Sequence, residues 1–317
     1  VVYYWLKSPR QVVTLDFVDS AGKVIRNFTS NQDPQVRADS LRADSVRRAR
    51  GDTTRATVDS AARSEARSEE TPEDAPRRAP PPPRVSNKAG LNSFAWNLRY
   101  REAVSFENMI LWAANTQGPV ALTGRYGVRM TVAGGPPETQ WFTLRPDPRS
   151  KATRAELADQ FAFLSAVRDR TSDANNAVRT IRNVRWQIGN RQSRLPESQR
   201  SAFAQTASPI LTELASIEGE IYQVKNQSGQ DPLNYPIKLN NKIAALAGVA
   251  SDSDTRPTAQ TREVFRILSA QLETQLERMR VAMKGLAPLN SHLTSAGVPL
   301  IVPSTAEIPL VRPPSGS

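Results

Sequence analysis

Hydrophobic and polar positions alternate with a period of two along residues 11–17, within a strand-rich stretch over 1–30. Val13, Leu15 and Phe17 fall on one face of the run 11–17, and the polar positions fall between them. This alternation is typical of a half-buried strand. The turn-forming stretch 19–22 ends in glycine, and residues 23–28, which include Val24, Ile25 and Phe28, return as a second strand. The pattern therefore predicts a hairpin, preceded by a further strand over residues 1–6.

The pattern disappears between residues 31 and 88. Large apolar side chains are scarce there, and Arg, Asp, Ser, Ala, Glu and Pro dominate. The stretch contains a short tandem repeat over 37–46 and a run of four prolines over 80–83. Such a composition does not bury enough apolar surface to offset the entropy of ordering. We therefore predict that residues 31–88 form a disordered insertion.

Strand patterns resume after the insertion. Apolar or alternating stretches cover residues 92–98, 109–112, 124–132 and 139–144. Short strands at this spacing favour an antiparallel β-sandwich. The sequence thus predicts an Ig-like β-sandwich built from residues 1–30 and 89–146 and interrupted by the insertion.

From residue 150 onward the hydrophobic period changes to 3.6. Thr153 and Glu156 have the spacing of a capping box, and an apolar seam follows over more than 30 residues. A second seam, from Phe203 to Val224, starts after Pro196, and a third runs from Val264 to Met283, with a short helix over 237–246 between them. We predict an antiparallel three-helix bundle over 150–288. An extended Pro-rich tail follows over 289–317, with 300–302 as its docking point. The predicted fold class is multi-domain α+β.

Composition narrows the chemistry. The chain has no cysteine and a single histidine, His292, which excludes disulfides, cysteine nucleophiles and thiolate metal sites. No nucleophile motif, phosphate-binding loop or pair of catalytic carboxylates is present. No apolar run reaches the length of a membrane span. We predict a non-enzymatic chain without catalytic, cofactor-binding or metal-binding residues.

Because the net charge is +11, clustered basic residues are the remaining candidates for a partner-binding surface. Arg179, Arg182 and Arg185 lie along the first long helix beside Trp186, and they form a candidate partner surface. The alternative is that these arginines are a solvated face, because they are interspersed with acids. In the same helix, the pair Asn175–Asn176 is either a buried polar layer or solvent-facing.

Some segments resemble a known family. Residues 13–26 (VTLDFVDSAGKVIR), 90–98 (GLNSFAWNL) and 124–130 (GRYGVRM) resemble the Ig-like module of flagellar hook-capping proteins. Residues 233–242 (LNYPIKLNNK) resemble the C-terminal end of bacterial BNR-repeat, sortilin-like β-propeller proteins, which are often labelled glycosyl hydrolases. The resemblance implies an exported protein, at the cell surface, periplasmic or extracellular, whose active site would lie in the propeller. No site residue carries over to this chain, and the insertion departs from the compact module.

Three functions follow as hypotheses. The first is a non-catalytic accessory region of a larger exported protein, which braces a preceding β-propeller and binds a partner or forms a homo-oligomer. Apolar helix residues beyond those that three helices can bury would support it. The second is one wall of a glycan- or peptide-hydrolysing site completed by the propeller. The third is an anionic-polymer binder that uses the Arg-rich helix. Nucleic acid is disfavoured as a partner because acids are scattered among the arginines.

Overall fold

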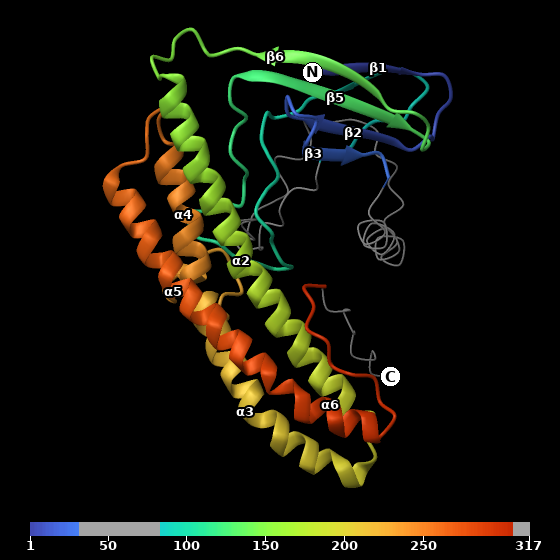
Figure 1. The fold of residues 1–317 in the computed structure, drawn as a ribbon, viewed down its shortest axis with the longest axis vertical. Helices are drawn as coiled ribbons and strands as arrows, with labels where there is room; N and C mark the ends of the chain where they lie inside the picture. The colour runs from blue at the N-terminus through green and yellow to red at the C-terminus, as the bar shows by residue number, and fades with distance from the viewer. Residues whose placement is uncertain (32–82, 307–317) are drawn as a thin grey trace, which may run out of the picture. The chain divides into compact units, whose positions relative to one another are not determined.

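The computed structural model describes residues 1–31 and 83–306 and has the α+β fold class that the sequence predicts (Figure 1). Its described residues form two compact units. The β unit contains residues 1–31, 83–99 and 123–147. The helical unit contains residues 100–122 and 148–306.

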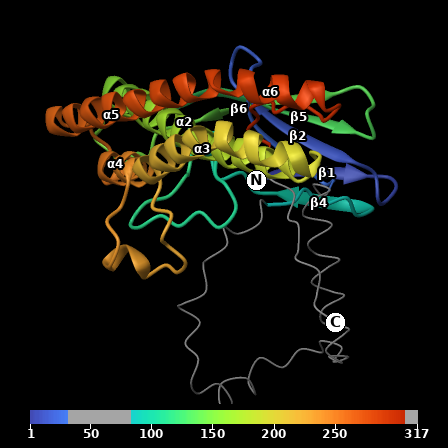
Figure 2. The ribbon, with the colours of Figure 1, turned by 90° about the horizontal axis from the view of Figure 1, so that it is seen from below.

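The β unit contains two antiparallel sheets. β1 (Val2–Leu6) pairs with β4 (Gly90–Phe94), and together they form a two-stranded ribbon (Figure 2). The second sheet has the order β3-β2-β5-β6 (Figure 1), and the predicted hairpin is its β2–β3 pair. The strands of this sheet are β2 (Val13–Val18), β3 (Val24–Thr29), β5 (Gly124–Val132) and β6 (Glu138–Leu144).

Aromatic side chains from both sheets form the core of the β unit. Val13, Leu15 and Phe17 are fully buried, which confirms the predicted inward face of the hairpin. The Phe17 ring lies 4.5 Å from that of Trp96 and 5.9 Å from that of Phe28, between ring centroids. Phe28 lies 4.6 Å from Phe94 of the ribbon. The two sheets are therefore joined through contacts between aromatic rings.

The insertion that the sequence predicts over residues 31–88 ends before residue 88. Residues 32–82 lie outside the described part of the chain, and the prediction of disorder falls mainly on them. Val85, by contrast, is buried. The Tyr4 hydroxyl donates to the Ser86 carbonyl oxygen at 2.5 Å, and Ser86 Oγ donates to Asn92 Oδ1. Residues 85 and 86 thus belong to the β unit, because they supply packing and hydrogen bonds to β1 and β4.

Helices of very different length build the helical unit. Thr153 and Glu156 make the predicted capping box at the start of the longest, α2. The buried residues of α2 and α3 follow the two seams predicted from the sequence, although Val224 lies beyond α3 and is exposed. The helices are α2 (Arg154–Gln192), α3 (Glu197–Ile221), α4 (Leu239–Ser251), α5 (Ala259–Lys284) and α6 (Leu286–Ser295), with a 3-10 turn, η1 (Asp231–Leu233) (Figure 1).

Two parts of the predicted bundle need correction. α4 packs against both α2 and α5, and α6 also adds buried residues to the core, so more than the three predicted helices enclose it. The last long helix, α5, ends at Lys284 with Gly285 as its C-cap, but the extended tail does not start at 289, because the separate helix α6 continues through Pro288 and buries Leu289 and Leu293. A proline in the first turn removes no helical hydrogen bond. The tail docks as predicted, since Ile301 is buried and exchanges hydrogen bonds with Asn290.

Residues 100–122 were expected in the β-sandwich and lie instead with the helices. The segment doubles back on itself: Tyr100 N donates to the Pro119 carbonyl oxygen, and Ala103 N to that of Thr116. The passing backbones are so close that a Cβ on Gly118 would lie 2.3 Å from the Tyr100 carbonyl oxygen. Residues 109–112 are not a strand. The segment forms part of the helical core through Phe106.

Candidate functional site

Polar groups of α2 and α4 hold the segment 100–122. Ser172 Oγ accepts from Val104 N at 3.1 Å, and Asn175 Nδ2 donates to the Val104 carbonyl oxygen at 2.6 Å. Asn175 is fully buried, and its Oδ1 accepts from Asn240 Nδ2. Asn175 is therefore a buried polar contact, the first of the two alternatives open from the sequence. Both the nitrogen and the oxygen of its side-chain amide have hydrogen-bond partners, as burial of a polar group requires.

A second side-chain amide, that of Asn241, binds the same segment at Trp112. Asn241 Oδ1 accepts from Trp112 N at 2.6 Å, and Asn241 Nδ2 donates to the Trp112 carbonyl oxygen at 2.9 Å. One side chain on α4 thus pairs with both backbone groups of one residue, as a neighbouring strand would. Asn241 is buried, so loss of either bond would leave a buried atom of its side-chain amide without a partner.

The arginines of the predicted partner surface take part in an internal ion pair. Glu218 of α3 is only 3% exposed, and its two oxygens accept from Arg182 Nε at 2.6 Å and Arg185 Nη1 at 2.8 Å. The Arg182 guanidinium also lies over the rings of Phe106 and Tyr222. Two cations thus compensate for the lost hydration of this buried carboxylate.

Tyr222 completes this cluster. Its hydroxyl accepts from Ile110 N at 3.2 Å and donates to the Asn108 carbonyl oxygen at 3.4 Å. Burial raises the pKa of the Tyr222 phenol above its ordinary value, because the charged phenolate would lose its hydration. The other two predicted surface residues lie differently: Trp186 is half-buried, and Arg179 Nε is buried with no hydrogen-bond partner among the described residues. The four residues do not form one exposed patch.

α5 carries a second apolar stripe that the helical core does not cover. Its inward face contributes Leu268 and Leu272 to the core. Ile267 and Val281 are 42% and 55% exposed on another side of the helix. With Ala270 and Thr274 they follow spacings of three, four and seven residues, which places all four on one face. We call these four residues the outer stripe.

A groove runs between α3 and three residues of the outer stripe, Ala270, Thr274 and Val281. It encloses about 970 Å³ and is lined mainly by apolar atoms. Pro209, inside α3, and Ile210 form the wall opposite α5. Its lining residues are Pro209, Ile210, Glu213, Ala270, Glu273, Thr274, Glu277, Arg278, Val281, Ala282 and Gly285. The small side chains on α5 leave room for an apolar element of another chain to approach closely.

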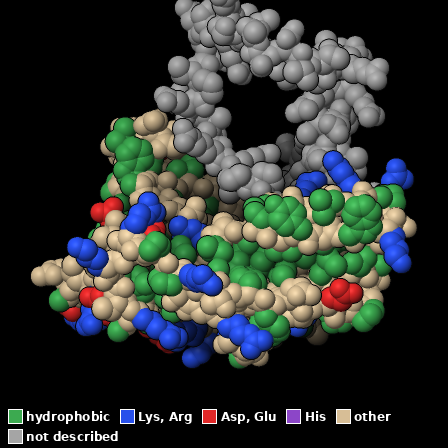
Figure 3. All heavy atoms as spheres, turned by 90° about the horizontal axis from the view of Figure 1, so that it is seen from above, with side chains coloured by type: hydrophobic (Ala, Val, Ile, Leu, Met, Phe, Trp, Pro, Cys, Tyr) green, Lys and Arg blue, Asp and Glu red, His purple; other side chains and the backbone are tan. Residues whose placement is uncertain are grey.

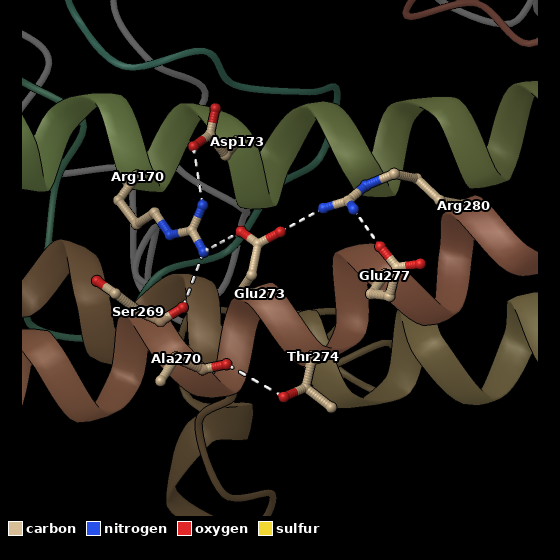
Figure 4. Close-up of polar contacts among 8 residues, drawn as sticks. All are labelled: Arg170, Asp173, Ser269, Ala270, Glu273, Thr274, Glu277 and Arg280. Atoms are coloured by element: carbon tan, nitrogen blue, oxygen red, sulfur yellow. Dashed lines mark hydrogen bonds and ion pairs between the residues drawn. The ribbon is translucent and has the colours of Figure 1, made fainter.

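Charges of both signs surround the groove (Figure 4). Glu273 accepts from Arg170 of α2 at 2.9 Å and also from Arg280, and these hydrogen bonds hold the pKa of its carboxyl below the ordinary range. Arg280 also contacts Glu277. On the α3 side, Arg278 Nε donates to Glu213 Oε1 at 2.9 Å. The rim is therefore a set of ion pairs with acid and base in alternation.

The described residues hold no group of His, Asp or Glu that could bind a metal ion, and His292 lies within α6. Within the same ranges, none of the helices combines the length and apolarity that a membrane crossing needs. No family model, curated protein or solved structure matches the chain.

Proposed function

We propose that this chain is a non-catalytic interaction region that self-associates through the groove between α3 and α5. The outer stripe carries the proposal, because Ile267 and Val281 are apolar side chains beyond those that the helical core buries. Exposed apolar residues that follow a helical period are typical of a helix that packs against another helix. This is the feature that favours an interaction role over a catalytic one.

The occupant that fits best is a second copy of the same face. A twofold pairing brings one surface against itself, so each acidic rim residue needs a basic one within the same surface. Glu213 and Glu277 beside Arg278 and Arg280 meet this requirement. The 26 residues of α5 span about 39 Å, and two helices are about 20 Å wide, which gives about 800 Å² for each partner. That area is typical of a stable interface.

The wider setting is proposed on the sequence resemblance. The β unit would be an Ig-like sandwich and the helical unit an antiparallel bundle, together bracing a preceding β-propeller of an exported parent protein. Any glycan- or peptide-hydrolysing site would then lie in that propeller. Self-association through the helical unit is compatible with this role and does not depend on it.

The test is the mass of the protein in solution. Size-exclusion chromatography with light scattering should give a dimer for the unchanged chain. Ala270→Arg places a long charged side chain in the groove without removing a core contact, so we expect a monomer with an unchanged thermal melt. Ala155→Arg is the matched control, because Ala155 is an exposed helical alanine on α2 outside the groove.

Either of two results would contradict self-association through this face. One is an unchanged chain that stays monomeric at every concentration tested. The other is a dimer whose mass and concentration dependence are the same for Ala270→Arg and Ala155→Arg. Val281→Ser provides a second variant, which removes apolar area without adding charge, and we expect it to weaken the dimer.

A further inference from the structure

The β1–β4 ribbon turns one face inward and leaves the other uncovered by described residues. Tyr4 and Leu6 point into the core. Tyr3, Trp5 and Leu91 alternate with the buried positions and are 68%, 67% and 69% exposed. In the strand register Trp5 stands opposite Leu91, so these side chains are neighbours on one face. We call these three residues the ribbon face.

Basic residues surround one end of the ribbon face. Lys7 follows β1, Lys88 precedes β4, and the pairing of Leu6 with Gly90 brings these two ends together. Arg10 is fixed at the same end, because its backbone N donates to the Asn87 carbonyl oxygen at 2.9 Å. All three cations are exposed, and none has an ion-pair partner among the described residues. The exposed apolar face of the ribbon therefore ends in a group of positive charges that have no ion-pair partner among the described residues.

Acidic residues are scarce in this part of the molecule. Residues 1–15 and 83–101 contain no Asp or Glu. Over the described residues of the β unit, ten Lys and Arg stand against four Asp and Glu, an excess of six positive charges. Figure 3 shows hydrophobic side chains gathered on one side of the β unit, with Lys and Arg at the margin. A partner complementary to this surface would carry both apolar groups and negative charge.

We propose that the ribbon face docks on an anionic lipid bilayer. Trp and Tyr prefer the headgroup level of a membrane, an aliphatic side chain reaches the acyl boundary, and Lys and Arg attract anionic headgroups. A nucleic acid or acidic glycan would use the cations and the rings but offers nothing to Leu91. Protein interfaces are depleted in lysine, whereas two of the three cations here are Lys7 and Lys88. The bilayer is the partner that uses every component of the surface.

Co-sedimentation with lipid vesicles tests this docking. We expect the full chain to sediment with vesicles of phosphatidylcholine and phosphatidylglycerol, and to stay in solution with phosphatidylcholine alone. Lys7→Gln with Lys88→Gln should lower the partition coefficient about 30-fold, at about fivefold for each lysine. Tyr3→Ser with Trp5→Ser should lower it by more than about tenfold through lost apolar contact.

Leu91→Ser has a matched control in Leu233→Ser, because Leu233 of η1 is 68% exposed in the helical unit. We expect the first variant to weaken sedimentation and the second to leave it unchanged. Equal effects of the two variants, or no sedimentation with anionic vesicles, would overturn the proposal. Binding to heparin or single-stranded DNA without vesicle binding would overturn it as well, in favour of a soluble polyanion. None of these outcomes affects the measurement of the dimer, because the proposed dimer uses another surface.

Discussion

At the residue scale, the ion pair at Glu218 connects the parts of the helical unit. A carboxylate that is 3% exposed is unfavourable in a protein interior unless cations and hydrogen bonds compensate for its lost hydration. Arg182 and Arg185 from α2 supply both, and the Arg182 guanidinium reaches Phe106 of the segment 100–122. One acidic side chain thus fixes two arginines, and through them a loop far away in the sequence.

Replacing this carboxylate should destabilise the helical unit. We expect Glu218→Gln to lower the free energy of unfolding by about 1–3 kcal/mol, since a charge-assisted pair becomes a weaker contact with one acceptor. Urea denaturation measures the change. Glu263→Gln is the control, because Glu263 pairs with Arg266 at the surface, and we expect no measurable effect there. A Glu218→Gln protein as stable as the unchanged chain would contradict the role given to this pair.

Tyr222 predicts a dependence on alkaline pH. Burial raises the pKa of its phenol above the ordinary value of 10.0, so the folded chain keeps the proton where the unfolded chain releases it. The stabilisation is fully present below pH 10 and is lost as pH rises through the raised pKa. We expect the free energy of unfolding to fall less steeply above pH 10 in Tyr222→Phe than in the unchanged chain. Parallel profiles from denaturation at several pH values would contradict this.

At the element scale, the segment 100–122 behaves as part of the helical core although it is not helical. Asn175 and Asn241 pair with its backbone at two separate points, and Phe106 enters the apolar cluster. The segment pairs part of its own backbone, and the amides add to these bonds as a sheet neighbour would, because backbone groups in a packed segment need hydrogen-bond partners. Its stability should therefore depend on these side chains more than on its own sequence.

Removing one amide should loosen the segment locally. In Asn241→Ala we expect the Trp112 amide to exchange with solvent about tenfold to a hundredfold faster, for about 1–3 kcal/mol of lost hydrogen bonding. Hydrogen exchange followed by mass spectrometry or NMR measures this. Asn234→Ala, at an exposed position in the loop before α4, is the control. Equal protection of Trp112 in both variants would show that the amide does not hold the segment.

Local patterns predicted most of the elements, whereas the contacts of the segment 100–122 were not predictable. The seams of α2 and α3 and the faces of β2 depend on neighbouring residues, so periodicity was enough. Asn175 and Val104 are 71 residues apart, and no local signal links them. The helix α6 was not predicted because a glycine and a proline, Gly285 and Pro288, indicate the end of a helix, although Leu289 and Leu293 have helical spacing. The apolar residues of the outer stripe are visible in the sequence of α5, but the helical period alone did not distinguish them from the residues that face the core.

At the scale of the whole molecule, each unit has its own apolar core. The aromatic core between the sheets contains residues of the β unit. The large helical cluster contains residues of the helical unit alone, from Phe106 to Ile301. Separate cores favour separate cooperative transitions, because each unit can lose its packing while the other keeps its own.

Calorimetry should therefore resolve two unfolding transitions. Leu15 and Leu214 are both fully buried, one in each core. We expect Leu15→Ala and Leu214→Ala each to destabilise one unit by about 2–5 kcal/mol and to shift a different transition. A single transition that both variants shift alike would show that the two units unfold together.

The path of the segment 100–122 has a consequence for how these units can be exchanged. The chain enters the helical unit at residue 100, returns to the β unit at 123, and leaves it again after 147. A cut after residue 147 would separate the helices from Phe106 and from the backbone groups that Asn175 and Asn241 bind. Residues 148–306 alone are therefore not a complete folding unit that can be moved into another protein. A gene fusion that moves it intact must also carry residues 100–122, by circular permutation or as a second fragment.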